Sequence, residues 1–145
     1  MTDAEREPSH AEDADGDAST AYGEFPLKEF LGMEVTGDEP GVGIARVEVG
    51  ADHLNPNGVV HGAVLFALVD TAMGKSTMSV LEPGRFCASI EVSLRFIRPA
   101  SSGQLTATAT VVKRGRSVIH LDARVAGDDD RLVATAAGTF AIVDP

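Results

Sequence analysis

The sequence lacks several features that mark common classes of protein. It has a single cysteine, so no internal disulfide can form, which fits a reducing compartment such as the cytoplasm. No run of 18 apolar residues occurs, which argues against a membrane-spanning helix. The first residues are acidic and small, unlike a secretory signal peptide. These absences predict a cytoplasmic protein that does not enter a membrane.

Motifs for several kinds of catalysis are also missing. There is no Gly-x-Ser-x-Gly elbow, no Cys-x-x-Cys pair and no glycine cluster of the phosphate- or dinucleotide-binding type. The four histidines show no zinc-ligand spacing, so we expect neither a metal nor a bound cofactor. Asp52 and His53 could form an acid–base pair, but adjacent side chains point apart, and we interpret both as exposed loop residues. We interpret Cys87 as a packed side chain, with a reactive thiol as the alternative.

Positive charge is scarce as well. Lysine occurs three times, and acids outnumber bases by 22 to 12. Residues 1–20 carry six of the ten net negative charges and almost no large apolar side chains, which predicts a disordered acidic tail. An acidic surface repels phosphate backbones and disfavours nucleic-acid binding. The composition is typical of halophilic proteins, and equally of an ordinary acidic protein with a charged leader.

The remainder, residues 21–145, is long enough for one domain. An apolar stretch without alternation predicts a long buried helix from Val59 to about Leu81, stopped by Glu-Pro-Gly at 82–84. Segments rich in Val, Ile, Thr and Phe, separated by short turns, predict a meander of antiparallel strands. The pattern indicates an α+β fold, in which a curved sheet surrounds a central helix. The other elements expected are a short helix over 27–31 ending at Gly32, strands beginning at 33–35 and over 42–49, a turn at 55–58, and strands over 88–96, 105–113, 117–125 and 132–143.

Asp70 is the residue that the expected helix explains least. An ionised carboxylate inside an apolar helix is unfavourable unless a partner stabilises it, and no lysine or arginine lies three or four positions away. Aspartate is also a poor helix former, which favours a functional role. The alternatives are that Asp70 bonds a strand backbone, or lies where the helix reaches the surface.

The stretch NPNGVVHGA, at residues 55–63, is the second candidate feature. A helix N-terminus presents unpaired N–H groups and a partial positive charge. Gly62 has no side chain, so its amide can approach a ligand closely and could stabilise an oxyanion. The alternative is that Gly62 serves helix–sheet packing and that His61 is an ordinary residue of a helix start.

The spacing of these residues resembles a known family. The pattern Asn55-x-x-Gly58-x-x-His61-Gly62, followed by Asp-Thr-Ala at 70–72, is similar to the signature of hotdog-fold acyl-CoA thioesterases of the phenylacetic-acid-degradation (PaaI) type. The similarity covers residues 27–143 and implies a hotdog fold, a curved antiparallel sheet wrapped around one long central helix. It also implies hydrolysis of an acyl-CoA, with an aryl, phenylacetyl or medium-to-long fatty acyl group, to the free acid and coenzyme A.

The resemblance implies a role for each matching residue. Asp70 acts as nucleophile or as general base on water, and the Gly62 N–H binds the thioester oxygen. Asn55 positions substrate or water, His61 supports the same loop, and Ser89 helps to orient the attacking water. In the family the site lies between two subunits, with Asp70 and Ser89 of one facing the other three residues of its partner. A homodimer, or a dimer of such dimers, is therefore implied.

Two features bear on substrate choice. The family's usual His-Gly-Gly is His-Gly-Ala at 61–63, and we expect Ala63 to narrow the space beside the thioester. The basic turn of Lys113, Arg114 and Arg116 is a candidate grip for the phosphates of coenzyme A, because guanidinium groups pair well with phosphate. A solvated hairpin tip is the alternative.

Two other functions suit the same fold. A hotdog protein could bind acyl-CoA without hydrolysing it, but the presence of both Asp70 and Gly62 disfavours this. A hydratase or dehydratase would need an Asp and a His about five residues apart ahead of the helix, whereas Asp52 has Asn57 at that offset. The sequence therefore predicts a thioesterase, and leaves open the acyl group and the chemical role of Asp70.

Overall fold

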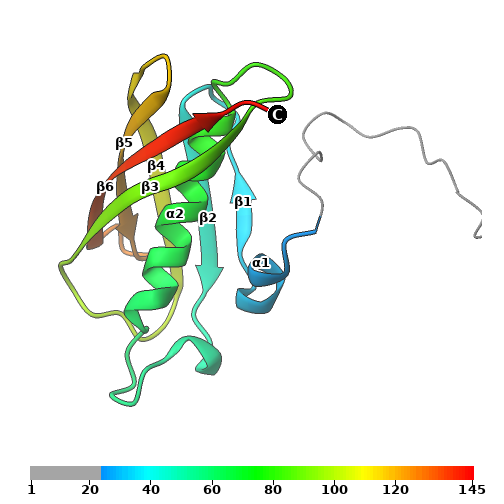
Figure 1. Ribbon diagram of the computed structural model, residues 1–145. Coiled ribbons are helices and arrows are strands. Elements are labelled where there is room, and N and C mark those ends of the chain that lie inside the picture. Colours follow the sequence, from blue (N-terminus) through cyan, green and yellow to red (C-terminus); the bar gives the residue numbers. More distant parts are fainter. Residues whose placement is uncertain (1–23) are drawn as a thin grey trace, which may run out of the picture.

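The computed structural model describes residues 24–145 as one antiparallel sheet curved around a helix (Figure 1). The predicted tail, residues 1–20, lies outside the described residues. Six strands pair in the order β1-β2-β4-β5-β6-β3. The elements are α1 (Pro26–Leu31), β1 (Glu34–Thr36), β2 (Val42–Glu48), the 3-10 turn η2 (Ala51–His53), α2 (Gly62–Met78), β3 (Phe86–Phe96), β4 (Gln104–Arg114), β5 (Val118–Ala126) and β6 (Leu132–Val143).

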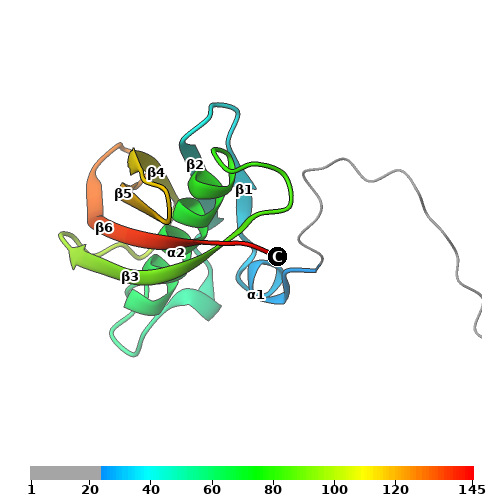
Figure 2. The ribbon, with the colours of Figure 1, turned by 45° about the horizontal axis from the view of Figure 1, so that its top comes forward.

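Helix α2 lies within the curve of the sheet, which wraps around it in Figure 2. Most of the buried residues of the helix are apolar, and Leu68, Val69 and Met73 are fully enclosed; Ser76 and Thr77 are the buried polar residues near its end. The strands alternate as half-buried strands should, with Ile119 and Leu121 of β5 directed to the helix and their neighbours to solvent. The predicted α+β hotdog architecture is therefore confirmed.

The predicted limits of the long helix were too wide at both ends. Val60 pairs with Leu54 as an isolated bridge, so the helix begins only after His61, whose side chain caps it. At the other end Ser79 Oγ donates to the Ser76 carbonyl at 2.6 Å and accepts from the Gly41 N–H at 2.7 Å. A serine that bonds the preceding turn in this way competes with the helical hydrogen bonds, and α2 ends at residue 78.

The strand order corrects the predicted meander. β4, β5 and β6 are consecutive neighbours, but β3 pairs with β6 at the edge of the sheet rather than with β4. The segment between β3 and β4 contains Pro99 and runs under the start of α2, where Ala100 accepts a hydrogen bond from the Val60 N–H at 2.8 Å. It is thus a crossing link and not a hairpin turn.

The remaining elements appear where the sequence predicts them. Helix α1 ends at Gly32, which adopts a left-handed conformation with φ of 71° and closes the helix as a glycine cap. A side chain at Gly43 in β2 would overlap the Ala72 carbonyl oxygen of α2, so this glycine allows strand and helix to pack closely.

Candidate active site

The start of α2 supplies the first candidate group, a backbone amide. His61 Nδ1 accepts a hydrogen bond from the Ala63 N–H at 2.9 Å and so caps the helix. The N–H groups of a first helical turn lack intrahelical acceptors, and the Gly62 N–H is one of these. A Cβ on Gly62 would lie 2.9 Å from Cζ of Phe96, so the ring packs here only because the residue is glycine. The arrangement can bind an oxyanion, which the helix dipole also favours.

A hollow of about 360 Å³ lies beside Gly62, between the start of α2 and the segment after β3. Its lining is mainly apolar, and its one charged member is Arg98. Sequence reasoning missed this residue together with Phe96 and Ile97; two large apolar side chains before a proline, both exposed, were the available signal. Ala63 is exposed but does not line the hollow. The lining residues are Val59, Val60, Gly62, Leu65, Phe96, Ile97, Arg98, Pro99 and Ala100.

Asp70 lies in the middle of α2, on the side that the sheet leaves partly open. Burial raises the pKa of Asp70 above its ordinary value of 3.8, and hydrogen bonding from the Ser89 side chain opposes this. Within residues 24–145, the buried Oδ1 atom of Asp70 has no hydrogen-bond partner. A buried acceptor without a partner is uncommon in proteins, which makes this oxygen a candidate for binding a water.

A β-bulge in β3 directs Ser89 toward α2. Ser89 lies opposite Phe140, which is buried on the helix side of the sheet, and directly opposed residues share a face. The register then shifts, with Ile90 as the extra residue before Glu91. The shift puts Val92 on the helix side and Glu91 on the outer face, so the bulge lets Ser89 reach Asp70 without burying a glutamate.

Cys87 lies two residues before Ser89 on the same face of β3 and packs half-buried against the core. Burial, and to a lesser degree the charge of Asp70, raises the pKa of the Cys87 thiol to about 11. The thiol is therefore protonated at neutral pH and a poor nucleophile, which agrees with the packed interpretation.

Asn55 organises the loop before α2. Its Oδ1 accepts hydrogen bonds from the N–H groups of Asn57 and Val59 at 2.9 and 3.3 Å. Its own N–H donates to the Val59 carbonyl at 2.7 Å. The side-chain oxygen is thus occupied by the loop, and the amide NH₂ is the part of Asn55 that can meet a ligand.

The prediction that His53 is an exposed loop residue was wrong. His53 is 7% exposed, and both of its ring nitrogens form hydrogen bonds within the protein. Asp52, in contrast, is exposed as expected. The error arose because the partners of His53 are backbone groups of α1 and η2, which no local pattern reveals.

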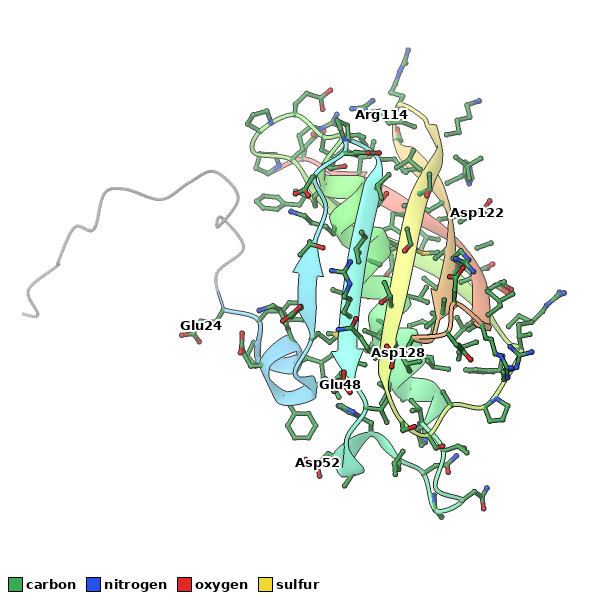
Figure 3. All side chains as sticks on the ribbon, turned by 180° about the vertical axis from the view of Figure 1, so that it is seen from behind. Glu24, Glu48, Asp52, Arg114, Asp122 and Asp128 are labelled. Atoms are coloured by element: carbon green, nitrogen blue, oxygen red, sulfur yellow. The ribbon has the colours of Figure 1, made fainter. Side chains whose placement is uncertain are left out.

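The basic turn lies far from Gly62 within one chain. Figure 3 shows Arg114 and Asp52 at opposite ends of the molecule, and Asp52 is at the end where α2 begins. Arg114 Nη2 bonds both carboxylate oxygens of Glu82, at 2.9 and 3.0 Å, so its guanidinium is already paired. Lys113 and Arg116 are exposed on the same turn.

Among residues 24–145, no group of three or more His, Cys, Asp or Glu side chains is placed to hold a metal ion. Over the same residues, no helix is long and apolar enough to cross a membrane.

Comparison with known proteins places this geometry in a family. Residues 57–134, which include the start of α2, Asp70 and Ser89, match the family described as the thioesterase superfamily. The 1,4-dihydroxy-2-naphthoyl-CoA hydrolase of Listeria monocytogenes is 24% identical over 116 residues, covering 80% of this chain and 94% of that protein.

Solved structures agree with this assignment. The PaaI protein from the phenylacetic acid degradation operon of E. coli superposes with a TM-score of 0.79 at 26% identity, covering 87% of this chain and 90% of that one. A conserved protein of Pseudomonas aeruginosa, PA5202, has a TM-score of 0.79 at 31% identity, covering 83% and 95% of the two chains. The chain therefore belongs to the thioesterase superfamily and is a hotdog-fold hydrolase of thioesters.

Proposed function

We propose that the protein hydrolyses acyl-CoA thioesters, with Asp70 as the reacting carboxylate. The observation that carries the proposal is the Asp70 side chain, half-buried in the middle of α2 with a raised pKa and an unpaired Oδ1. A carboxylate whose pKa is raised is a stronger base, and the unpaired oxygen is free to bind a water. The coenzyme A substrate is supported by the likeness to a naphthoyl-CoA hydrolase.

The proposed reaction begins with the thioester carbonyl oxygen on the Gly62 N–H. In one route Asp70 takes a proton from a water held by Ser89 and Asn55, and the hydroxide attacks the carbonyl carbon. In the other route Asp70 attacks directly, and water then hydrolyses the mixed anhydride. In both, negative charge develops on the carbonyl oxygen beside the helix N-terminus, and coenzyme A leaves as a thiolate.

One chain cannot supply both groups to one thioester. Gly62 and Asp70 are eight residues apart on α2, which separates them by about 12 Å along the helix axis. The reacting carbonyl carbon must lie about 3 Å from the nucleophile, and its oxygen must lie about 3 Å from the N–H donor of the oxyanion hole. We therefore propose that Asp70 and Ser89 of one protomer act with Gly62, His61 and Asn55 of a second copy.

The edge of the sheet offers a surface for that second copy. Within the described residues 24–145, β3 pairs with β6 on one side only, which leaves the N–H and C=O groups of its other side for a second chain. Ile90 and Phe96 of this edge strand are each 60% exposed. Joining two β3 edges by a two-fold axis would bury these side chains and bring the two sites together, as a homodimer requires.

For coenzyme A, we propose contacts with the phosphates from the basic turn. Arg114 is paired with Glu82, whereas Lys113 and Arg116 are exposed and have no ion pair within residues 24–145, so they are the proposed phosphate contacts. Ala63, exposed at the helix start, would meet the substrate from outside the hollow beside Gly62.

The test is release of free coenzyme A from a panel of aryl-, phenylacetyl- and fatty acyl-CoA thioesters. We expect wild type to hydrolyse at least one class and Asp70→Asn to lose about a hundredfold or more in kcat/KM. Asp122→Asn, which changes an exposed carboxylate of β5, is the matched control and should retain activity. If wild type hydrolyses none at low and at molar KCl, the proposal is wrong; binding of acyl-CoA without turnover would then identify a non-catalytic binding protein.

A further inference from the structure

We infer that His53 is a positioning residue for the reaction, which ties the C-terminus of α1 to the loop that presents the Gly62 amide. The inference rests on the proposed role of Gly62. It starts from the ring of His53, whose two nitrogens have different partners on two elements. Nδ1 lies 2.9 Å from the Gly50 N–H, and Nε2 lies 2.8 Å from the Leu31 carbonyl oxygen.

These partners define the state of the ring. A backbone N–H can only donate, so Nδ1 accepts and carries no proton. A carbonyl oxygen can only accept, so Nε2 carries the proton and donates. The neutral tautomer protonated at Nε2 satisfies both contacts, and the buried ring has no polar atom without a partner.

The bond to Leu31 is a tertiary contact. Leu31 is the last residue of α1, and its carbonyl is one of those that a helix C-terminus leaves unpaired. His53 follows 22 residues later, at the end of η2. The ring therefore fixes the end of η2 against α1, whereas its bond to Gly50 is local and shapes only the 3-10 turn.

The hydrogen bond from the His53 ring to the Leu31 carbonyl is called the anchor below, and the backbone of His53 connects it to the site. The His53 carbonyl accepts the His61 N–H at 2.8 Å, and the adjacent Leu54–Val60 bridge closes the same loop. His61 is the N-cap of α2, directly before Gly62. The loop of residues 54–60, with Asn55 inside it, is thus held at its base by the residue whose ring is bonded to α1.

Loss of the anchor should act on the reaction more than on binding. An oxyanion donor must lie within a few tenths of an ångström of its place in the transition state, and a 1 Å displacement can lower the rate about a hundredfold. The pKa of Asp70 is set by its burial and by the Ser89 side chain of its own chain, so its ionisation should not change with His53. The signature of a positioning role is a lower kcat with the acid limb of the pH–rate profile unmoved.

Three substitutions separate the two ring contacts. His53→Ala removes both. His53→Asn places an oxygen where Nδ1 was and keeps the local contact to Gly50. His53→Gln places an N–H near the position of Nε2 and keeps the contact to Leu31. We expect His53→Ala and His53→Asn to lower kcat about tenfold or more, with KM and the pH midpoint little changed, and His53→Gln to restore most of kcat.

The same variants should be examined by amide hydrogen exchange over residues 54–62. Faster exchange in His53→Ala and His53→Asn, with wild-type exchange in His53→Gln, would show the loss and rescue of the anchor without reference to catalysis. Wild-type kcat in all three variants, whatever their melting temperatures, would show a merely structural role and overturn the inference. Rescue by Asn but not by Gln would also overturn it. Failure of the proposed function is a separate result, since it requires the wild type itself to be inactive.

Discussion

At the scale of single residues, Asp70 is the member of the candidate site whose burial is least favourable for stability. Asp70 is an acid in an apolar helix interior, and its Oδ1 has no partner within residues 24–145. An isosteric residue without charge would suit the helix better. Retention of an unfavourable carboxylate at one position is typical of a functional site.

The stability of Asp70→Asn tests this reading of the residue. The pKa of Asp70 is higher in the folded protein than its ordinary value of 3.8. Ionisation of Asp70 therefore lowers the free energy of unfolding as the pH rises from 3.8 through the pKa of the folded protein. This loss of stability is complete once the pH exceeds the pKa of Asp70 in the folded protein. We therefore expect Asp70→Asn to melt at a higher temperature than wild type at pH 7, and the two melting temperatures to converge below pH 3.8, where Asp70 is protonated in both states.

The control is Asp122→Asn, an equal change of charge on the exposed outer face of β5. Thermal unfolding of the three proteins over a series of pH values measures both effects. A lower melting temperature for Asp70→Asn at pH 7 would mean that partners such as Ser89 stabilise the carboxylate by more than its burial costs, which would contradict the raised pKa.

The site could be predicted at this scale only in part. Asp70 stood out because it conflicts with its own helix, and Gly62 because it begins that helix. His53 could not be found, since its bond to Leu31 joins segments 22 residues apart. The position of Ser89 beside Asp70 followed from family resemblance, because the bulge that turns it inward has no sequence signal of its own.

At the scale of elements, the close packing of β2 on α2 depends on one glycine. A Cβ at Gly43 would overlap the Ala72 carbonyl oxygen and lie 2.5 Å from the Ser76 amide nitrogen. Both atoms belong to the helix backbone, which cannot move aside as a side chain can. Gly43 thus sets how near the helix, and Asp70 with it, lies to the sheet.

Gly43→Ala should accordingly lower the free energy of unfolding by about 2–4 kcal/mol. Gly50→Ala is the matched control, because its backbone is extended and no atom lies within 4 Å of the added Cβ. We expect it to change the free energy by no more than about 0.5 kcal/mol. Urea unfolding of both variants measures the difference, and equal midpoints would contradict the packing argument.

The helices and strands could be predicted where the spacing of apolar residues and the residue composition indicate the same element. The strands and both helices lie within a few residues of their expected places, because apolar alternation and turn formers act locally. Two predictions were wrong. The ends of the long helix are determined by Ser79 and by the Leu54–Val60 bridge, and β3 pairs with β6 rather than with β4. Strand pairing depends on how the sheet closes around α2, which is a property of the whole chain.

At the scale of the whole molecule, the proposed reaction divides one chain into two half-sites. About 12 Å of helix separates Gly62 from Asp70, so the amide and the carboxylate of one chain cannot meet at one thioester. A two-fold dimer in which each protomer completes the other has two whole sites, each with Gly62 of one chain and Asp70 of its partner. A site shared between two chains predicts a result that a site within one chain does not.

Two variants that we expect to be inactive alone should restore activity when they are mixed. Asp70→Asn lacks the reacting carboxylate, and Gly62→Ala keeps its N–H but places a Cβ beside it, which should prevent the thioester oxygen from approaching closely. In a dimer of one Asp70→Asn chain and one Gly62→Ala chain, one site contains both defects, but the other contains neither. If the chains assort at random, half of the dimers are mixed and each has one intact site, so co-expression should give about one quarter of wild-type activity. The Gly62→Ala chain alone must first be shown to fold, since its Cβ would lie 2.9 Å from Phe96.

Phe96→Ala, added to the Gly62→Ala chain, gives the Cβ room and serves as the control for that contact. The double variant with both Asp70→Asn and Gly62→Ala in one chain, co-expressed with wild type, is the complementary control: its mixed dimers have two singly damaged sites and should be inactive. Differently tagged chains, purified through both tags, isolate the mixed dimers for the measurement of kcat. Mixed Asp70→Asn and Gly62→Ala dimers that recover no activity would contradict a site shared between two chains. Since the length of α2 prevents Gly62 and Asp70 of one chain from meeting at one thioester, the assignment of Gly62 as the oxyanion donor would then be wrong.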